Sequence, residues 1–418
     1  RPYYEQDFAA GKIDEEKATY ILACLLLNDP HYYQIAGPDA QGRDQTSALS
    51  FMILEAAHRM NTTCNLTIRV HDGLDESLLR RAIEILLEDR KGFPRFSGDT
   101  ALVTGFMKNG YPASLARQRI AVGCNWMSLP GLEYTMNDLI KINLAKVFEV
   151  AYQEYSETPG EKNVAALYEL YQAHLAKAVQ CVAEGIDFHL ANQYRNAPEL
   201  TLNLISHGPI EKGLDASHGG LEYYNIAVDA SGLATTADSF AALEQRVEKE
   251  KIWDWDTVYQ AVQSDFAGTE GERIRQALWH GPRYGYGGSL GDAWADRLSQ
   301  GFTKAIASRR TPKGVLMIPG LFSWANTVMF GEMVGATPNG RHARAPISHG
   351  ANPNPGFRQD GAVTALSAAV ARVQPGYGNT APLQLEFDPQ LKPGKEAVDV
   401  IENLIRTHFA LGGTLINI

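Results

Sequence analysis

Apolar residues recur every three or four positions over several long stretches, a spacing typical of helices with one buried face. After Asp75 this spacing predicts a helix whose apolar side holds Leu78, Leu79, Ala82, Ile83, Leu86 and Leu87. Asp14 is suited to cap another helix, whose apolar face holds Ala18, Ile21, Leu22, Leu25 and Leu26. The same pattern predicts further helices at about 48–59, 139–151, 164–182 and 237–250, from the loop at 281–291 to about 308, and at 396–408.

Short strands are predicted between these helices. Leu66, Ile68 and Val70 alternate with polar residues up to His71, as in a half-buried strand. The apolar run 120–123 leads directly to Cys124, and a last strand is expected at 414–418. Because no internal repeat or linker interrupts the pattern, we expect residues 1–418 to form one continuous α/β unit.

Composition excludes several classes of protein. The 418 residues are 44% hydrophobic and 21% charged, with a net charge of −10, which disfavours binding to nucleic acid or to an anionic membrane surface. No segment reaches the roughly 20 apolar residues needed to cross a bilayer. The four cysteines form no Cys-x-x-Cys pair, so we expect no metal site and a reducing, cytoplasmic location.

Cys124 is the first candidate for chemistry. It follows a predicted strand and precedes a loop containing Pro130 and Gly131, a position from which a thiol can point into a cavity. The alternative is that it is a small core residue. A different candidate is Ser289 in Gly-Gly-Ser-Leu-Gly, which fits the nucleophile elbow of serine hydrolases. That elbow requires a strand immediately before it, and the sequence 282–286 does not predict one.

The residues around Cys124 resemble those of a known family. Ile-Ala-Val-Gly-Cys at 120–124, Pro-Gly at 130–131, Asp138 and Asn-Leu-Ala-Lys at 143–146 are similar to the active-site cysteine loop of the pyruvate formate-lyase family of glycyl radical enzymes. Other blocks resemble the family in the same order along almost the whole chain: Leu-Thr-Ile-Arg-Val-His at 66–71, Gly-Phe-Pro at 92–94 with Asp99, and the segments 232–239, 334–341 and 379–385.

The resemblance implies a fold and a reaction. It implies a ten-stranded α/β barrel over residues 1–418, with the cysteine loop 120–138 at its centre and helices around it. In this family a glycyl radical takes hydrogen from the cysteine, and the resulting thiyl radical takes hydrogen from a small substrate. The chemistry is anaerobic and sensitive to oxygen. The radical is installed by an activating enzyme that uses S-adenosylmethionine and an iron–sulfur cluster, and relatives are commonly homodimers.

The sequence departs from the family pattern in two respects. The radical-bearing loop, which the resemblance places after the strand at 412–417, is not within these residues, so we expect it to lie on a further segment, to have been cleaved, or to be supplied by another chain. Arg-Val-Gln-Pro-Gly-Tyr at 372–377 is only superficially similar to the radical motif, and Gly376 is interpreted as a turn residue. Trp126 stands where many relatives carry a glutamate base, and it cannot exchange a proton at neutral pH.

The resemblance and the chemistry of the side chains together nominate the substrate-binding residues. Asp138 matches a position that holds a substrate hydroxyl in a glycerol-dehydratase relative; the alternative is a helix N-terminal aspartate. Asn125 and Trp126 are expected to line the site, with a purely structural role as the alternative for each. His71 is a candidate proton carrier, and the alternative is a histidine at a strand end with its hydrogen bonds satisfied within the fold. Asp99 and Glu133 are candidates for the missing base. The expected function is a glycyl radical lyase acting on a small polar molecule through Cys124. The alternative is a non-catalytic barrel subunit that requires a separate radical-bearing chain.

Overall fold

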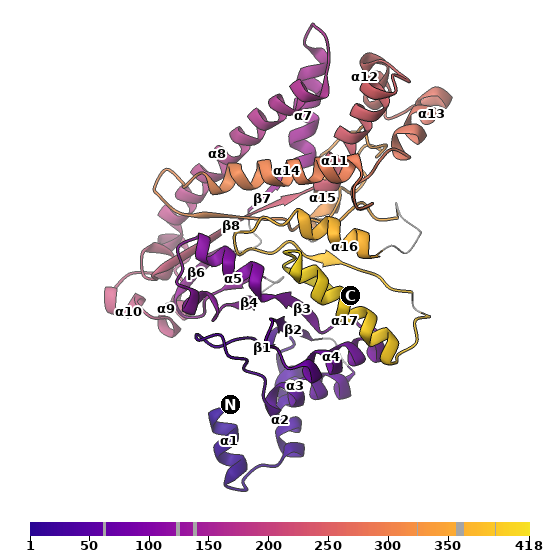
Figure 1. The fold of residues 1–418 in the computed structure, drawn as a ribbon. Helices are drawn as coiled ribbons and strands as arrows, with labels where there is room; N and C mark the ends of the chain where they lie inside the picture. The colour runs from indigo at the N-terminus through magenta and orange to yellow at the C-terminus, as the bar shows by residue number, and fades with distance from the viewer. Residues whose placement is uncertain (62–63, 123–125, 137–139, 324, 357–362, 389) are drawn as a thin grey trace. The chain divides into compact units, whose positions relative to one another are not determined.

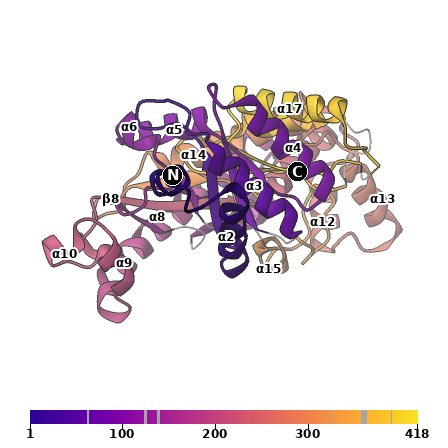
Figure 2. The ribbon, with the colours of Figure 1, turned by 90° about the horizontal axis from the view of Figure 1, so that it is seen from below.

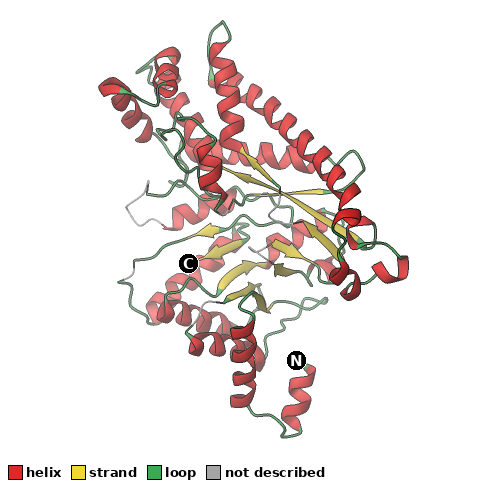
Figure 3. Cartoon of the chain, turned by 180° about the vertical axis from the view of Figure 1, so that it is seen from behind, coloured by secondary structure: helices red, strands yellow, loops and turns green. Residues whose placement is uncertain are grey.

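The computed structural model describes residues 1–418 except 62–63, 123–125, 137–139, 324, 357–362 and 389. The chain divides into two compact units, one of residues 1–129 and 383–418 and the other of residues 130–382. Both combine helices with sheets (Figure 3). The α/β class predicted from the sequence is therefore confirmed, and the single continuous unit stays a prediction.

The first unit contains a five-stranded mixed sheet. Its strands, in spatial order, are β1 (Tyr32–Ala36), β2 (Asn65–Val70), β3 (Arg95–Gly98), β11 (Leu415–Asn417) and β10 (Leu383–Gln384). The first three are parallel, and β11 runs antiparallel to β3. The strand predicted from the alternation of Leu66, Ile68 and Val70 is thus confirmed as β2. The residues of β2 after the first are buried on both faces, as is usual for a parallel strand.

The helices of the first unit follow their sequence signals closely. Asp75 caps α4 (Glu76–Asp89) by accepting a hydrogen bond from the Ser77 amide, and α4 buries the predicted apolar face. Asp14 caps α2 (Glu15–Asn28) in the same way, but of its predicted apolar face only Ala18 and Leu26 are buried, whereas Ile21 and Leu25 are exposed. Figure 2 shows α4 beside α17 (Lys395–Ala410), and an ion pair from Arg80 to Glu402 joins them. The remaining helices of the unit are α1 (Pro2–Ala9), α3 (Ala48–Met60), α5 (Asp99–Lys108) and α6 (Ala113–Ala116).

The second unit is organised on a sheet of four parallel strands. Its longest strand, β8 (Tyr223–Ser231), pairs with β6 (Glu133–Met136), β7 (Lys141–Asn143) and β9 (Met317–Gly320). Its longer helices are α7 (Leu144–Glu157), α8 (Val164–Asn196), α11 (Leu233–Leu243) and α14 (Leu290–Ala307), and Figure 1 shows α7 beside α8. The shorter elements are α9 (Leu200–Ile205), α10 (Pro209–Lys212), η1 (Ala216–His218), η2 (Glu244–Lys249), α12 (Trp255–Gln263), α13 (Gly268–Trp279), α15 (Asn326–Glu332) and α16 (Val363–Arg372).

Two sequence predictions about this unit were wrong in their boundaries. The helix predicted from residue 139 begins at Leu144, because residues 141–143 form β7 and the Asn143 side chain accepts a hydrogen bond from the Lys146 amide. A strand of three residues directly before a helix is too short to show the two-residue spacing of a strand in the sequence. The helix predicted at 164–182 extends to Asn196. Across the described residues, no helix combines the length and the apolar character needed to cross a membrane.

An aromatic cluster forms part of the core of the second unit. Phe240 is fully buried and stacks on Trp294, with ring centroids 4.6 Å apart. Phe148 meets Phe240 edge-on at 5.0 Å, and Tyr168 and Tyr171 contact its ring from α8. Because the cluster joins α7, α8, α11 and α14, removal of its central ring would leave a cavity between four helices.

We therefore predict that Phe240→Ala lowers the free energy of unfolding by about 3–5 kcal/mol, measured by urea denaturation. The matched control is Phe188→Ala on α8, where the side chain is 73% exposed, and it should change stability by less than about 0.5 kcal/mol. Equal effects of the two substitutions would contradict the assignment of Phe240 to the core.

The thiol of Cys64 makes the stability of the folded chain depend on pH. Burial raises the pKa of its thiol from 9.0 to about 11, although the charges of Arg95 and Lys91 act in the opposite direction. Between these two pKa values the folded chain keeps a proton that the unfolded chain has lost. Stability from this group is therefore complete below pH 9.0 and is lost as the pH rises through about 11.

We predict that the unfolding free energy of the unsubstituted protein falls more steeply across this pH window than that of Cys64→Ala. Urea titrations at several pH values within the window measure the two slopes, with Cys181→Ala, at an exposed cysteine, as the control. Parallel slopes for the unsubstituted protein and Cys64→Ala would contradict the raised thiol pKa.

Candidate active site

A two-stranded hairpin flanks the predicted catalytic cysteine. Strands β4 (Ile120–Val122) and β5 (Trp126–Ser128) are antiparallel, and Val122 pairs with Trp126. The three residues that connect them, with Cys124 and Asn125 among them, lie outside the described residues, as does Asp138. The described part of the site consists of the residues that hold the two strands in place.

Arg119 anchors the start of this hairpin. Its side chain is fully buried, and one guanidinium nitrogen donates to Asp99 Oδ1 at 2.6 Å. A second nitrogen contacts Met127 Sδ on β5 at 2.6 Å. Burial lowers the pKa of Arg119 to about 9, while the Asp99 carboxylate acts to raise it. The cation is thus held in the interior chiefly by one carboxylate.

Asp99 binds a second guanidinium group as well. Arg69 on β2 donates from Nε to Asp99 Oδ1 at 2.8 Å and from Nη2 to Oδ2 at 2.9 Å, a bidentate pair. Arg69 also donates to the backbone carbonyl of Arg119 at 3.1 Å. Both oxygens of Asp99 are occupied in this way, and its side chain is only 5% exposed. This geometry suits a residue that fixes the hairpin better than one that exchanges protons with a substrate.

Gln34 attaches the hairpin to the five-stranded sheet. Its Oε1 accepts a hydrogen bond from the Ala121 amide at 2.9 Å, and its Nε2 donates to the Arg119 carbonyl at 3.3 Å. Trp126 is buried, and its indole nitrogen has no hydrogen-bond partner among the described residues. The sequence analysis did not identify Gln34, Arg69 or Arg119. No local signal distinguishes Arg69, since it occupies one of the polar positions that alternate with Leu66, Ile68 and Val70.

His71 lies at the end of β2 and is bound to a different partner. Its Nδ1 accepts from the Gly73 amide at 3.2 Å, so Nε2 carries the proton and donates to Asp44 Oδ1 at 3.0 Å. Among the described contacts, none joins His71 to Asp99 or to the hairpin. Its role as a proton carrier stays a prediction.

Glu133 belongs to the other unit. It is buried at the start of β6 and accepts a hydrogen bond from the Thr135 hydroxyl at 2.7 Å. The structure thus brings Asp99 and the strand carrying Trp126 together, and places Glu133 on a separate sheet. Within the described parts of the chain, no cluster of three or more histidine, cysteine or carboxylate side chains could hold a metal ion.

The serine-hydrolase interpretation is not supported. Residues 280–289 contain no strand, and Ser289 is the N-cap of α14. Its hydroxyl donates to the Arg283 carbonyl and accepts from the Asp292 amide at 3.1 Å, as in a capping box. Gly376 lies in a loop with a positive φ of 68°, consistent with its interpretation as a turn residue.

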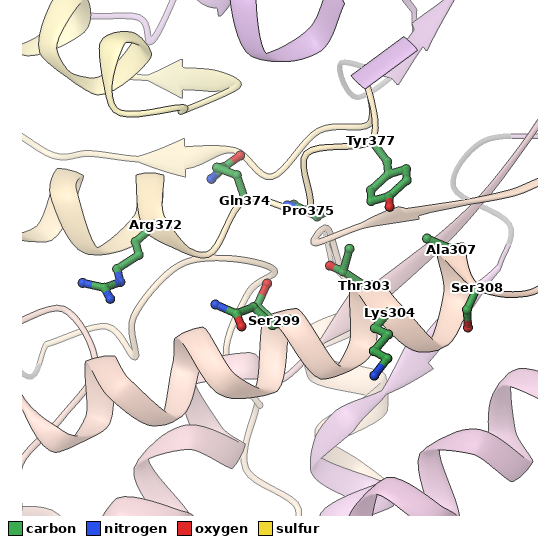
Figure 4. A pocket seen from close by; sticks show the side chains of 10 residues that line it. Ser299, Thr303, Lys304, Ala307, Ser308, Arg372, Gln374, Pro375 and Tyr377 are labelled. Carbon is green, nitrogen blue, oxygen red and sulfur yellow. The ribbon is translucent and has the colours of Figure 1, made fainter. Parts of the chain in front are cut away.

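A pocket of about 340 Å³ adjoins that loop (Figure 4). It lies between α14 and residues 372–377, and none of the predicted site residues lines it. In Figure 4 the Lys304 and Arg372 side chains extend in different directions, and Arg372 pairs with Asp296 at 3.2 Å. The two cations therefore do not converge on one ligand position.

Comparison with known proteins gives a consistent set of relatives. A family model described as pyruvate formate lyase-like matches residues 1–331. The chain is 25% identical to trans-4-hydroxy-L-proline dehydratase from Clostridioides difficile, over 99% of this chain and 56% of that protein. The chain thus spans about half the length of such relatives.

Two solved structures share the fold along the entire chain. One, described as 1,2-propanediol dehydration in Roseburia inulinivorans, has a TM-score of 0.91 at 23% identity and is covered over 57% of its length. The other, a glycyl radical enzyme from Archaeoglobus fulgidus, has a TM-score of 0.90 at 24% identity and is also covered over 57%. These structures establish the similarity of fold.

We predict that Asp99→Asn lowers the free energy of unfolding by about 3–5 kcal/mol, because two buried guanidinium groups would lose their counter-charge. Urea denaturation measures the loss. The control is Asp7→Asn, which removes an exposed ion pair with Lys12 and should cost less than about 1 kcal/mol. If Asp99→Asn proves as mild as the control, the cluster does not support the hairpin.

Proposed function

We propose that this chain, which belongs to the pyruvate formate lyase-like family of glycyl radical enzymes, is part of an anaerobic lyase in which Cys124 carries the radical that attacks the substrate. The family model over residues 1–331 is the observation that carries the proposal. The Gly-Cys sequence at 123–124, which the resemblance matches to the active-site loop, identifies the residue. In the proposed full protein, the two units contribute to the ten-stranded barrel that the resemblance implies.

The reaction begins with a hydrogen transfer. The thiyl form of Cys124 takes a hydrogen atom from a substrate carbon, which restores the S–H bond and leaves the unpaired electron on that carbon. A bond from the neighbouring carbon to a leaving group then breaks, and the product radical recovers a hydrogen atom from the thiol. A glycyl radical, when supplied, provides the unpaired electron at the start. Its installation by an enzyme that uses S-adenosylmethionine and an iron–sulfur cluster is part of the proposal.

Departure of a hydroxyl as water requires a proton donor and acceptor near the substrate. Trp126 cannot serve, and Asp99 is bound by two guanidinium groups. Glu133, a buried carboxylate with a hydroxyl donor, is the better of the two proposed bases. Asn125 and Trp126 are proposed to line the site and Asp138 to hold a substrate hydroxyl, with His71 as a further proton carrier.

The substrate is proposed to be a small hydroxylated molecule, since one relative is a trans-4-hydroxy-L-proline dehydratase. A homodimer in a reducing, cytoplasmic environment completes the proposal. The alternative, a non-catalytic subunit that requires a separate radical-bearing chain, is tested by the same experiment.

We expect Cys124→Ala to abolish turnover. The proposed full protein, with its radical-bearing segment, is incubated without oxygen with an activating enzyme and S-adenosylmethionine, and loss of hydroxylated substrates is followed by mass spectrometry. Cys181→Ala, at an exposed cysteine of α8, is the matched control and should keep full activity. Turnover by Cys124→Ala at the rate of the unsubstituted protein would exclude the proposed role. Absence of turnover in the activated, unsubstituted protein would favour the non-catalytic alternative.

A further inference from the structure

Helix α2 of the first unit is apolar around most of its circumference. From Tyr20 to Leu27 it consists only of hydrophobic residues, and its charged and polar residues lie toward its two ends. A helix that is apolar all round is normally buried all round, because apolar side chains gain free energy when they leave water. We therefore expect α2 to have packing partners on more than one side.

Among the described residues, only one side of α2 is covered. Helix α3 packs along α2 (Figure 1), and the buried residues of α2 are Ala18 and Leu26. These two lie about two turns apart on one side of the helix, with Leu22 between them. Helix α1, which precedes α2, has no buried residue of its own.

The remaining surface of α2 presents exposed apolar side chains. At about 100° per residue, Tyr20, Cys24 and Leu27 form one row outside the covered side, and Ile21 and Leu25 form a neighbouring row. The four largest of these residues are between 49% and 69% exposed, and Cys24 is partly exposed. We call these five residues the outer face of α2.

An isolated exposed apolar residue is normal on a protein surface, but a contiguous group of them indicates a contact site. Val400 on α17 is an isolated case. It is 54% exposed, but the exposed residues around it on the helix are polar, namely Glu396, Asn403 and Thr407. No polar residue interrupts the outer face of α2. The outer face thus has the composition of an interface.

The length of a relative indicates where the partner of this face comes from. Trans-4-hydroxy-L-proline dehydratase from Clostridioides difficile matches 99% of this chain, but only 56% of that protein is covered. More than two-fifths of it therefore has no counterpart in residues 1–418. Parts of one polypeptide usually bury apolar surface against each other. Rows of apolar side chains three or four residues apart are the pattern by which one helix packs on another.

We propose that the outer face of α2 binds the apolar face of a helix in a segment of the proposed full protein outside residues 1–418. Helix α2 would then lie between α3 and this partner helix. Its apolar run would be buried on both sides, as its composition indicates. The inference rests on the proposed function only for the existence of the full protein, and radical chemistry has no part in it.

Cys24 makes the contact measurable, because its thiol belongs to the outer face. The proposed full protein and the 418-residue chain, both carrying Val400→Cys as a reference thiol, are labelled with N-ethylmaleimide, and each site is followed by peptide mass spectrometry. A covering helix blocks access to the thiol and raises its pKa. Labelling of Cys24 relative to the reference should therefore be slower by about 10-fold or more in the full protein than in the 418-residue chain. An equal ratio in the two would overturn the proposal.

Labelling of the full protein at several concentrations identifies the partner. Protection of Cys24 that is independent of concentration would support a partner helix in the same polypeptide. Protection that disappears on dilution would assign the outer face to a second copy of the chain and would overturn the proposal.

Introduction of a charge gives a second measurement. In the full protein, Ile21→Glu should lower the melting temperature by at least about 3 °C, because it places a carboxylate in an apolar contact. Val400→Glu is the matched control, since the two side chains are similarly exposed, at 50% and 54%, and it should shift the melting temperature by less than about 1 °C. Equal shifts for the two variants would contradict the proposed contact.

These results are distinguishable from those that test the proposed reaction. Labelling and melting require neither activation nor substrate. Turnover that survives in Cys124→Ala would exclude the catalytic proposal while leaving the protection of Cys24 intact. Conversely, rapid labelling of Cys24 in an active full protein would overturn the contact of α2 and leave the catalytic proposal standing.

Discussion

The carboxylate of Asp99 is the point on which the arrangement around the cysteine hairpin depends. It lies at the start of α5 and binds the guanidinium groups of Arg69 and Arg119, one from β2 and one from the segment before β4. Two buried cations close together repel each other, and each would be costly to bury alone. A single carboxylate between them makes the arrangement possible, and its hydrogen bonds join α5, β2 and the start of the hairpin.

This cluster also fixes the position of the hairpin. Arg119 stands immediately before β4, so its ion pair with Asp99 fixes the start of the hairpin. Gln34 also holds the hairpin in place, since its side-chain amide binds the backbone carbonyl of Arg119 and the backbone amide of Ala121. Charged and amide hydrogen bonds are directional, whereas apolar packing is not. Such bonds suit a site in which a reactive side chain must be held in one position.

The four-stranded sheet of the second unit also contains buried polar and charged side chains. There, one face of the central strand β8 presents the apolar residues Ile226, Val228 and Ala230, and the other presents the buried polar residues Asn225, Asp229 and Ser231. Asp229 and Asn379 approach Gly320 from two separate segments, β8 and the loop after α16.

The sequence determined the local elements, because caps and periodicity act over a few residues: Asp75 and Asp14 cap helices as expected, and alternation placed β2 correctly. It also determined the family, since the blocks around Cys124 occur in a fixed order. The tertiary structure alone decided which partners the charged residues find. Arg69, Asp99 and Arg119 are distant along the chain, and no local pattern states that they meet. The neighbourhood of Lys141, Asp229 and Gly320 on three different strands likewise appears only in the tertiary structure, because pairing between strands is a non-local interaction that periodicity along one strand cannot encode.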